Sequence, residues 1–71
     1  MSLVCEYPSV TPGERIRVEC RHGLYSSHRR AGFLNRKVHG SEITMTAEQA
    51  GYAHDYARTH GHRAGELVRG R

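Results

Sequence analysis

The sequence predicts a small α+β domain in which an antiparallel β-hairpin sheet is covered by one C-terminal α-helix. Three observations predict this fold. Residues 15–20 alternate strictly between apolar and polar side chains, a turn signal precedes them at residues 11–14, and residues 46–60 carry the signals of a helix. The chain of 71 residues is short enough for one domain only. We place this domain at residues 1–62, followed by a basic, flexible tail at residues 63–71.

The hairpin is predicted by the turn and the strand that follows it. In the sequence TPGE at residues 11–14, proline presets φ at the second position and glycine accepts the positive φ that a type II turn needs at the third. If these two residues form the whole loop, Cys5 lies opposite Cys20 in the hairpin. Beyond Cys20, Gly23 permits a second tight turn, and residues 24–29 can return as a more polar strand.

The helix has both a start and a stop signal. Thr46 is followed three residues later by Gln49, which is the spacing of a capping box, and Gly61 supplies the stop. These signals predict a helix at about residues 46–60. Small residues dominate the side of it that would pack on the sheet: Ala47, Ala50, Ala53, His54 and Ala57.

The composition leaves little material for a hydrophobic core. Trp is absent and Phe33 is the only phenylalanine, so a disulfide, a metal or a partner chain is expected to add stability. No apolar run approaches the roughly 20 residues that span a bilayer. The N-terminus does not resemble a signal sequence, and we therefore expect a cytoplasmic protein. In a reducing compartment, cysteine and histidine together favour a metal site over a cystine.

Two Cys and His pairs could provide four ligands for a structural zinc ion. Cys20 and His22 are two residues apart at the end of a strand, and His54 and His60 lie on the predicted helix. Zinc commonly takes one close pair of ligands from a turn and another from a helix. Cys5 competes for a place in this set. A Cys5–Cys20 disulfide and a core without metal are the two alternatives.

A resemblance supports the zinc hypothesis. The sequence VECRHGL at residues 18–24, followed by AGYAHDYARTHGH at residues 50–62, resembles small actinobacterial and phage proteins with a C-x-[CH]-G turn and a histidine pair on a C-terminal helix. More broadly it is similar to ββα zinc fingers. The resemblance implies zinc ligation by Cys20, His22, His54 and His60. Because His22 stands where a second cysteine is expected, Cys5 and His62 remain competitors for the third and fourth positions.

The positive charge of the chain is concentrated in its middle. The formal net charge is +4, and no acidic residue lies between Glu19 and Glu42. Residues 30–41 have no clear period, which is typical of a loop. Basic side chains that could contact phosphate gather in and beside it: Arg29, Arg30, Arg36 and Lys37. This pattern predicts a partner that is nucleic acid or an acidic surface of a host protein.

The sequence therefore predicts a small basic zinc-binding module that binds nucleic acid mainly through phosphate contacts. The alternative is a phage or bacterial regulatory module that docks on a host protein, with or without metal. That alternative predicts an exposed apolar patch around Phe33 and Leu34. We expect neither an enzyme nor a small-molecule substrate, because no general base with an orienting partner is readable in so short a chain.

Overall fold

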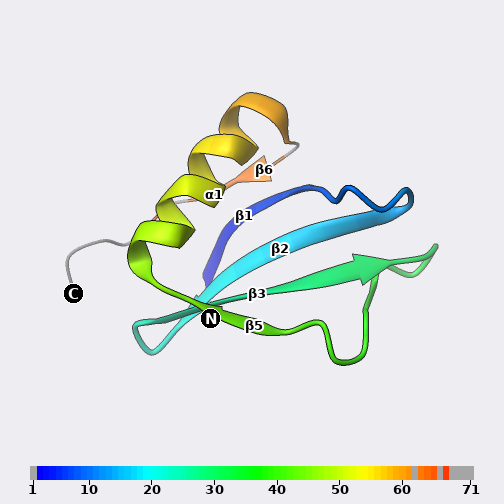
Figure 1. Ribbon diagram of the computed structural model, residues 1–71, viewed down its shortest axis with the longest axis horizontal. Coiled ribbons are helices and arrows are strands. Elements are labelled where there is room, and N and C mark those ends of the chain that lie inside the picture. Colours follow the sequence, from blue (N-terminus) through cyan, green and yellow to red (C-terminus); the bar gives the residue numbers. More distant parts are fainter. Residues whose placement is uncertain (1, 62, 66, 68–71) are drawn as a thin grey trace.

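The computed structural model describes residues 2–61, 63–65 and 67 of the chain. Within them an antiparallel sheet is packed against a helix that lies across the β1 side of the sheet (Figure 1). The elements in chain order are β1 (Ser2–Pro8), β2 (Glu14–Arg21), β3 (Leu24–Ala31), β4 (Arg36–Lys37), β5 (Ile43–Met45), α1 (Ala47–His60) and β6 (Arg63–Ala64).

The small α+β class is confirmed, but the sheet is larger than a ββα hairpin. Five of its six described strands have the order β4-β3-β2-β1-β6, and the sixth, β5, pairs with β3. Strand β3 pairs with β2 along all of its residues, from Leu24 to Ala31. Its other edge pairs with β4 and β5. Part of the stretch at residues 30–41 that was expected to be a loop is therefore strand. No described helix is long and apolar enough to cross a membrane.

The sheet also continues past residue 62. Arg63 pairs with Glu6 and Ala64 with Cys5, so these two residues form β6 rather than the start of a flexible tail. The backbone N–H of Gly65 then donates to the carbonyl oxygen of Val4 at 2.6 Å. The tail prediction is wrong at this point because the free edge of β1 offers backbone hydrogen bonds that a sequence pattern does not display.

The first hairpin has the predicted turn and a different register. Glu14 N–H donates to the Thr11 carbonyl oxygen, and Gly13 has φ of +82°, as a type II turn requires. The loop, however, spans residues 9–13, so Tyr7 pairs with Ile16 and Cys5 with Val18, two places from the predicted register. A type II turn does not match the twist of paired strands, and extra loop residues absorb the difference. Cys5 therefore does not face Cys20, and both cysteines are free.

The second hairpin explains why histidine and glycine follow the cysteine-bearing strand. Arg21 pairs with Leu24, which leaves only His22 and Gly23 in the loop. Both have positive φ, +53° and +78°, as in the type I′ turns that join tightly paired strands. Histidine is among the few side chains that tolerate this region. His22 is thus a turn residue and lies just beyond the strand, which ends at Arg21.

The helix is built and placed as its sequence predicts. Thr46 caps it, with Gln49 N–H donating to Thr46 Oγ1 and Thr46 N–H donating to Gln49 Oε1. The predicted stop is also found, since the Gly61 N–H donates to the carbonyl oxygen of Ala57 at 2.7 Å. The core joins the buried helix residues to buried residues of the sheet: Val4, Cys5, Val18, Tyr25, Ala50, Ala53 and Ala57. Ala47, by contrast, is exposed.

The helix divides the sheet into two unlike faces. Residues that pair across strands share a face, and residues alternate along each strand. Ile16, Val18 and Cys20 pack toward the core beneath α1. The opposite side, which we call the helix-free face, carries most of the charged residues of the strands and one histidine: Glu6, Arg15, Arg17, Glu19, Arg21, His28, Arg30, Lys37 and Arg63.

Replacing His22 tests its role as a turn residue. His22→Asn should change the free energy of unfolding by less than about 0.5 kcal/mol, because asparagine suits a positive φ. His22→Val should lose about 1–2 kcal/mol, because a β-branched residue is disfavoured there. Urea unfolding followed by circular dichroism measures both values. A loss of several kcal/mol in His22→Asn would contradict the turn role and would favour metal ligation by His22.

Candidate functional site

The cysteines of the predicted metal site belong to the core. Cys5 has no exposed surface, and its pKa is raised by burial to about 11. Cys20 is half-buried on β2, packs against the core and pairs with Tyr25 in the sheet. A zinc ligand must be a thiolate, and burial in an apolar environment opposes that form. The Cys5 thiol therefore behaves as a small core side chain in this fold, and Cys20 packs against the same core.

The helical histidines have other contacts. His54 Nε2 lies 2.6 Å from the carbonyl oxygen of Gly65, and since a carbonyl only accepts, this nitrogen carries the proton. The bond fastens the segment after β6 to the helix. His60 stacks on Tyr56 with the ring centroids 4.6 Å apart, and its Nδ1 lies 2.7 Å from Thr59 Oγ1. His54 thus has a structural use that the sequence did not indicate.

The predicted zinc ligands do not converge in the part of the chain that the structure describes. His22 is in the exposed turn between β2 and β3, whereas His54 and His60 are on α1. Among the described residues no group of three or more His, Cys, Asp or Glu side chains could hold a metal ion. His62 lies outside the described residues. Zinc binding consequently stays a prediction from the sequence.

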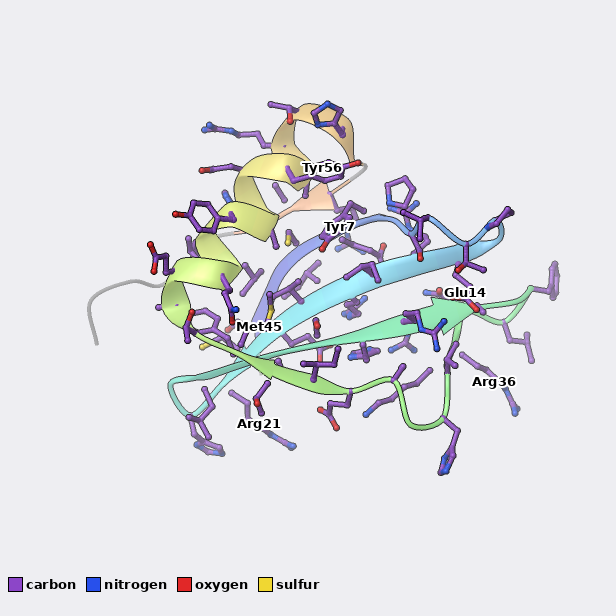
Figure 2. All side chains as sticks on the ribbon, in the orientation of Figure 1. Tyr7, Glu14, Arg21, Arg36, Met45 and Tyr56 are labelled. Atoms are coloured by element: carbon purple, nitrogen blue, oxygen red, sulfur yellow. The ribbon has the colours of Figure 1, made fainter. Side chains whose placement is uncertain are left out.

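The basic residues singled out in the sequence are divided between the two faces of the sheet. Arg30 and Lys37 pair with each other across β3 and β4 on the helix-free face. Arg29 pairs with Ile16 on the other face, where its Nη1 lies 3.0 Å from Glu14 Oε1. Arg36 is exposed on that second face and lies far from Arg21, at the opposite end of the sheet (Figure 2). The four basic residues therefore do not form the single loop patch that the sequence predicts.

The centre of the helix-free face is a chain of ion pairs. Glu6 lies between two arginines, with Arg15 Nε at 3.4 Å and Arg17 Nη1 at 3.6 Å from its carboxylate oxygens. Arg17 Nε also donates to Glu19 at 2.8 Å. The carboxylate side chains are 8% and 14% exposed, whereas the side chains of Arg15 and Arg17 are 26% and 25% exposed. The two arginine side chains are thus more exposed than the carboxylates with which they pair, although Arg15 Nη2 is buried and has no hydrogen-bond partner among the described residues.

The β3 side of the same face has a buried histidine under cationic side chains. His28 is 4% exposed, and its Nε2 lies 3.3 Å from Arg30 Nη1. Arg30 is also held by its Nε, which donates to the carbonyl oxygen of Asn35 at 2.8 Å. Arg30 and Arg15 are direct neighbours across β3 and β2. The fixed guanidinium of Arg30 therefore extends the positive layer from β2 onto β3.

Sequence reasoning missed Arg15, Arg17 and Arg63 as candidates. The alternating pattern of residues 15–20 did place Arg15 and Arg17 on the polar side of a strand, so part of the signal was present. Their convergence with Arg30 depends on the pairing of β2 with β3, and that of Arg63 on the pairing of β6 with β1. Neither long-range pairing can be read from periodicity.

The pKa of His28 provides a test of its buried position beside the cations of the helix-free face. Burial lowers this pKa below its ordinary value of 6.5; Glu19 raises it, and Lys37, Arg30 and Arg17 lower it further. Because the unfolded chain takes up the proton more readily, the stability that neutral His28 provides is complete above pH 6.5 and is lost as the pH falls below it. His28→Gln should flatten the fall in unfolding free energy as the pH drops below 6.5. Urea unfolding at several pH values measures this, and parallel profiles would contradict the placement of His28.

Thiol labelling tests the burial of Cys5. With a pKa of about 11, roughly 0.1% of its thiol is ionised at pH 8, and the side chain has no exposed surface. Iodoacetamide should therefore modify the half-buried Cys20 first in the folded protein, and both cysteines at similar rates in urea. Peptide mass spectrometry separates the two sites. Equal labelling of Cys5 and Cys20 in the folded protein would contradict the position of Cys5 in the core.

Comparisons with known proteins add no family to this description. Models of protein families, curated proteins and solved structures contain no match to this chain. The resemblance to small zinc-finger-like proteins therefore stays a prediction, and the function has to be argued from the geometry of the helix-free face.

Proposed function

We propose that this protein binds nucleic acid through phosphate contacts made by the helix-free face of its sheet. The observation that carries the proposal is the layering of charge on that face. The side chains of Glu6 and Glu19 are nearly covered, whereas those of Arg15 and Arg17 keep about a quarter of their surface exposed. The surface that this face offers to a partner is therefore mainly that of arginine side chains, and a chain of phosphates complements such a surface.

The basic residues around this layer extend it into a broad field. Arg30 and Lys37 continue it across β3 and β4, Arg63 flanks it on β6, and Arg21 lies beyond its other end. Neighbouring strands are about 4.8 Å apart, and successive residues on one face of a strand are about 7 Å apart. Several phosphates of one strand can therefore be contacted together. Most of these cations are arginines, whose planar group binds phosphate in a bidentate manner.

The proposed contacts carry little sequence information. Phosphate contacts fix the position of a protein on nucleic acid, whereas base contacts specify the sequence. The helix lies on the other face of the sheet and bears acidic Glu48 and Asp55, so it is poorly suited to enter a groove beside this surface. We therefore propose binding with weak sequence preference. Structural zinc is not needed for this role and remains a separate prediction.

A second candidate is a protein-interaction module, and one observation favours it. Phe33 is fully exposed and Leu34 is 65% exposed in the loop between β3 and β4. Large apolar side chains presented in this way often mark protein contacts. The apolar area is confined to a loop tip, whereas the cationic field extends over several strands. We therefore place nucleic-acid binding first.

Paired charge variants test the proposed function. The double variant Arg21→Gln, Arg63→Gln removes two cations from the helix-free face, and Arg36→Gln, Arg58→Gln removes two from the other side. The first should weaken binding to a 20-base-pair duplex and lower the log–log salt slope by about 1–2, since each lost duplex phosphate contact changes it by about 0.9. Fluorescence anisotropy between 50 and 200 mM salt measures the slope.

The second double variant is the matched control, because it changes the net charge equally. It should bind the duplex nearly as the parent protein does. Equal weakening by the two variants would attribute binding to net charge alone. Binding that does not change with salt in the parent protein would reject the proposed function and favour the protein-interaction module.

A further inference from the structure

A groove opens on the helix side of the sheet, between the last turns of α1 and the first hairpin. Its volume is about 410 Å³. Apolar and aromatic side chains dominate its lining, which is Tyr7, Pro8, Ser9, Val10, Ile16 and Tyr56. Tyr7 and Tyr56 lie close together where β1 passes under the helix (Figure 2). The groove is on the face opposite to the charged layer and is not part of the proposed phosphate surface.

Tyr56 is the helix residue that lines the groove, and it belongs to a row of exposed rings on α1. Tyr52, Tyr56 and His60 are spaced four residues apart, so they lie on one side of α1. Tyr52 is 66% exposed and Tyr56 is 49% exposed. The ring of Tyr7 meets Tyr56 edge to face, with centroids 5.1 Å apart, while His60 lies flat against Tyr56 at 4.6 Å. Accessible ring surface of this kind can accept another flat ring.

The floor of the groove leads directly to an arginine. Tyr7 pairs with Ile16 across β1 and β2, and Ile16 pairs with Arg29 across β2 and β3. These three residues form a straight row over three strands, about 10 Å from end to end by the usual strand spacing. Arg29 is 41% exposed and lies on the same face as the groove. An aromatic slot and a cation thus lie in one row on the same face of the sheet.

We infer that this groove binds an unstacked base of single-stranded nucleic acid, with a neighbouring phosphate on Arg29. The inference rests on the proposed function and specifies the form of nucleic acid that this protein prefers. Single-strand binders combine aromatic side chains on which bases stack with cations that follow the backbone, and the cross-strand row supplies both.

The flat rings favour a base over an extended peptide. A proline-rich peptide also docks in aromatic grooves, but it has no use for a cation aligned with the slot. Arg29 retains exposed surface although it is paired with Glu14. A phosphate is thus able to contact Arg29 beside a docked base.

Four probes and two variants test the inference. The probes are a 12-residue oligothymidylate, an abasic oligonucleotide with the same phosphates, a duplex of matched charge and a 12-residue polyproline peptide. Tyr56→Leu removes the ring and keeps an apolar side chain, and Tyr56→Phe keeps the ring as its matched control. We expect Tyr56→Leu to weaken oligothymidylate binding about 5- to 100-fold, by the loss of one stacked base. Binding of the abasic probe and of the duplex should change by less than about 2-fold, and Tyr56→Phe should bind like the parent protein.

Tyrosine fluorescence gives a readout that needs no variant. The chain has four tyrosines and no tryptophan, so its emission comes from tyrosine alone. Oligothymidylate should quench this emission more than the abasic probe does. Equal quenching, or equal affinity for the two single-stranded probes, would overturn the inference while leaving phosphate binding intact. If the parent protein showed no salt-dependent binding to any oligonucleotide, the proposed function would be rejected instead. Tight binding of the polyproline peptide would assign the groove to a peptide.

Discussion

The rest of the structure depends on the close packing of α1 against β1. The buried residues of the helix are Ala50, Gly51, Ala53 and Ala57, so its backbone can lie near the sheet. At the end of the helix a Cβ atom on Gly61 would meet Tyr7 Cβ at 2.8 Å and the Glu6 carbonyl oxygen at 2.9 Å. Such small side chains contribute little apolar area each. The core is therefore thin, and the sheet keeps one face free of the helix.

The fold could be predicted where the signals are local. The capping box at Thr46, the stop at Gly61 and the type II turn before Glu14 act within a few residues, and the structure contains all of them. The register of the first hairpin could not be predicted, because loop length is set by strand twist as well as by the turn. The additional strands depend on pairings between distant segments. That His22 takes the positive φ of a two-residue turn was also not visible in the sequence.

The candidate site was only partly visible in the sequence, for a related reason. A basic, acid-poor middle segment correctly indicated a cationic protein, but sheet pairing sends Arg29 and Arg30 to opposite faces. The ion pairs at the centre of the helix-free face form because Glu6 on β1 lies between Arg15 and Arg17 on β2. A buried carboxylate is costly unless it is paired, so Glu6 fixes the positions of Arg15 and Arg17. Charge counts alone cannot supply that arrangement.

Nuclear magnetic resonance tests the central claim most directly, because each arginine can be observed separately. A short duplex titrated into ¹⁵N-labelled protein should shift the Nε–H signals of Arg15, Arg17, Arg21 and Arg30 and the amide signals of β2 and β3. Signals from Phe33 and Leu34 should move little. Shifts confined to the loop between β3 and β4, with the arginine signals unchanged, would contradict the claim that the helix-free face meets phosphate.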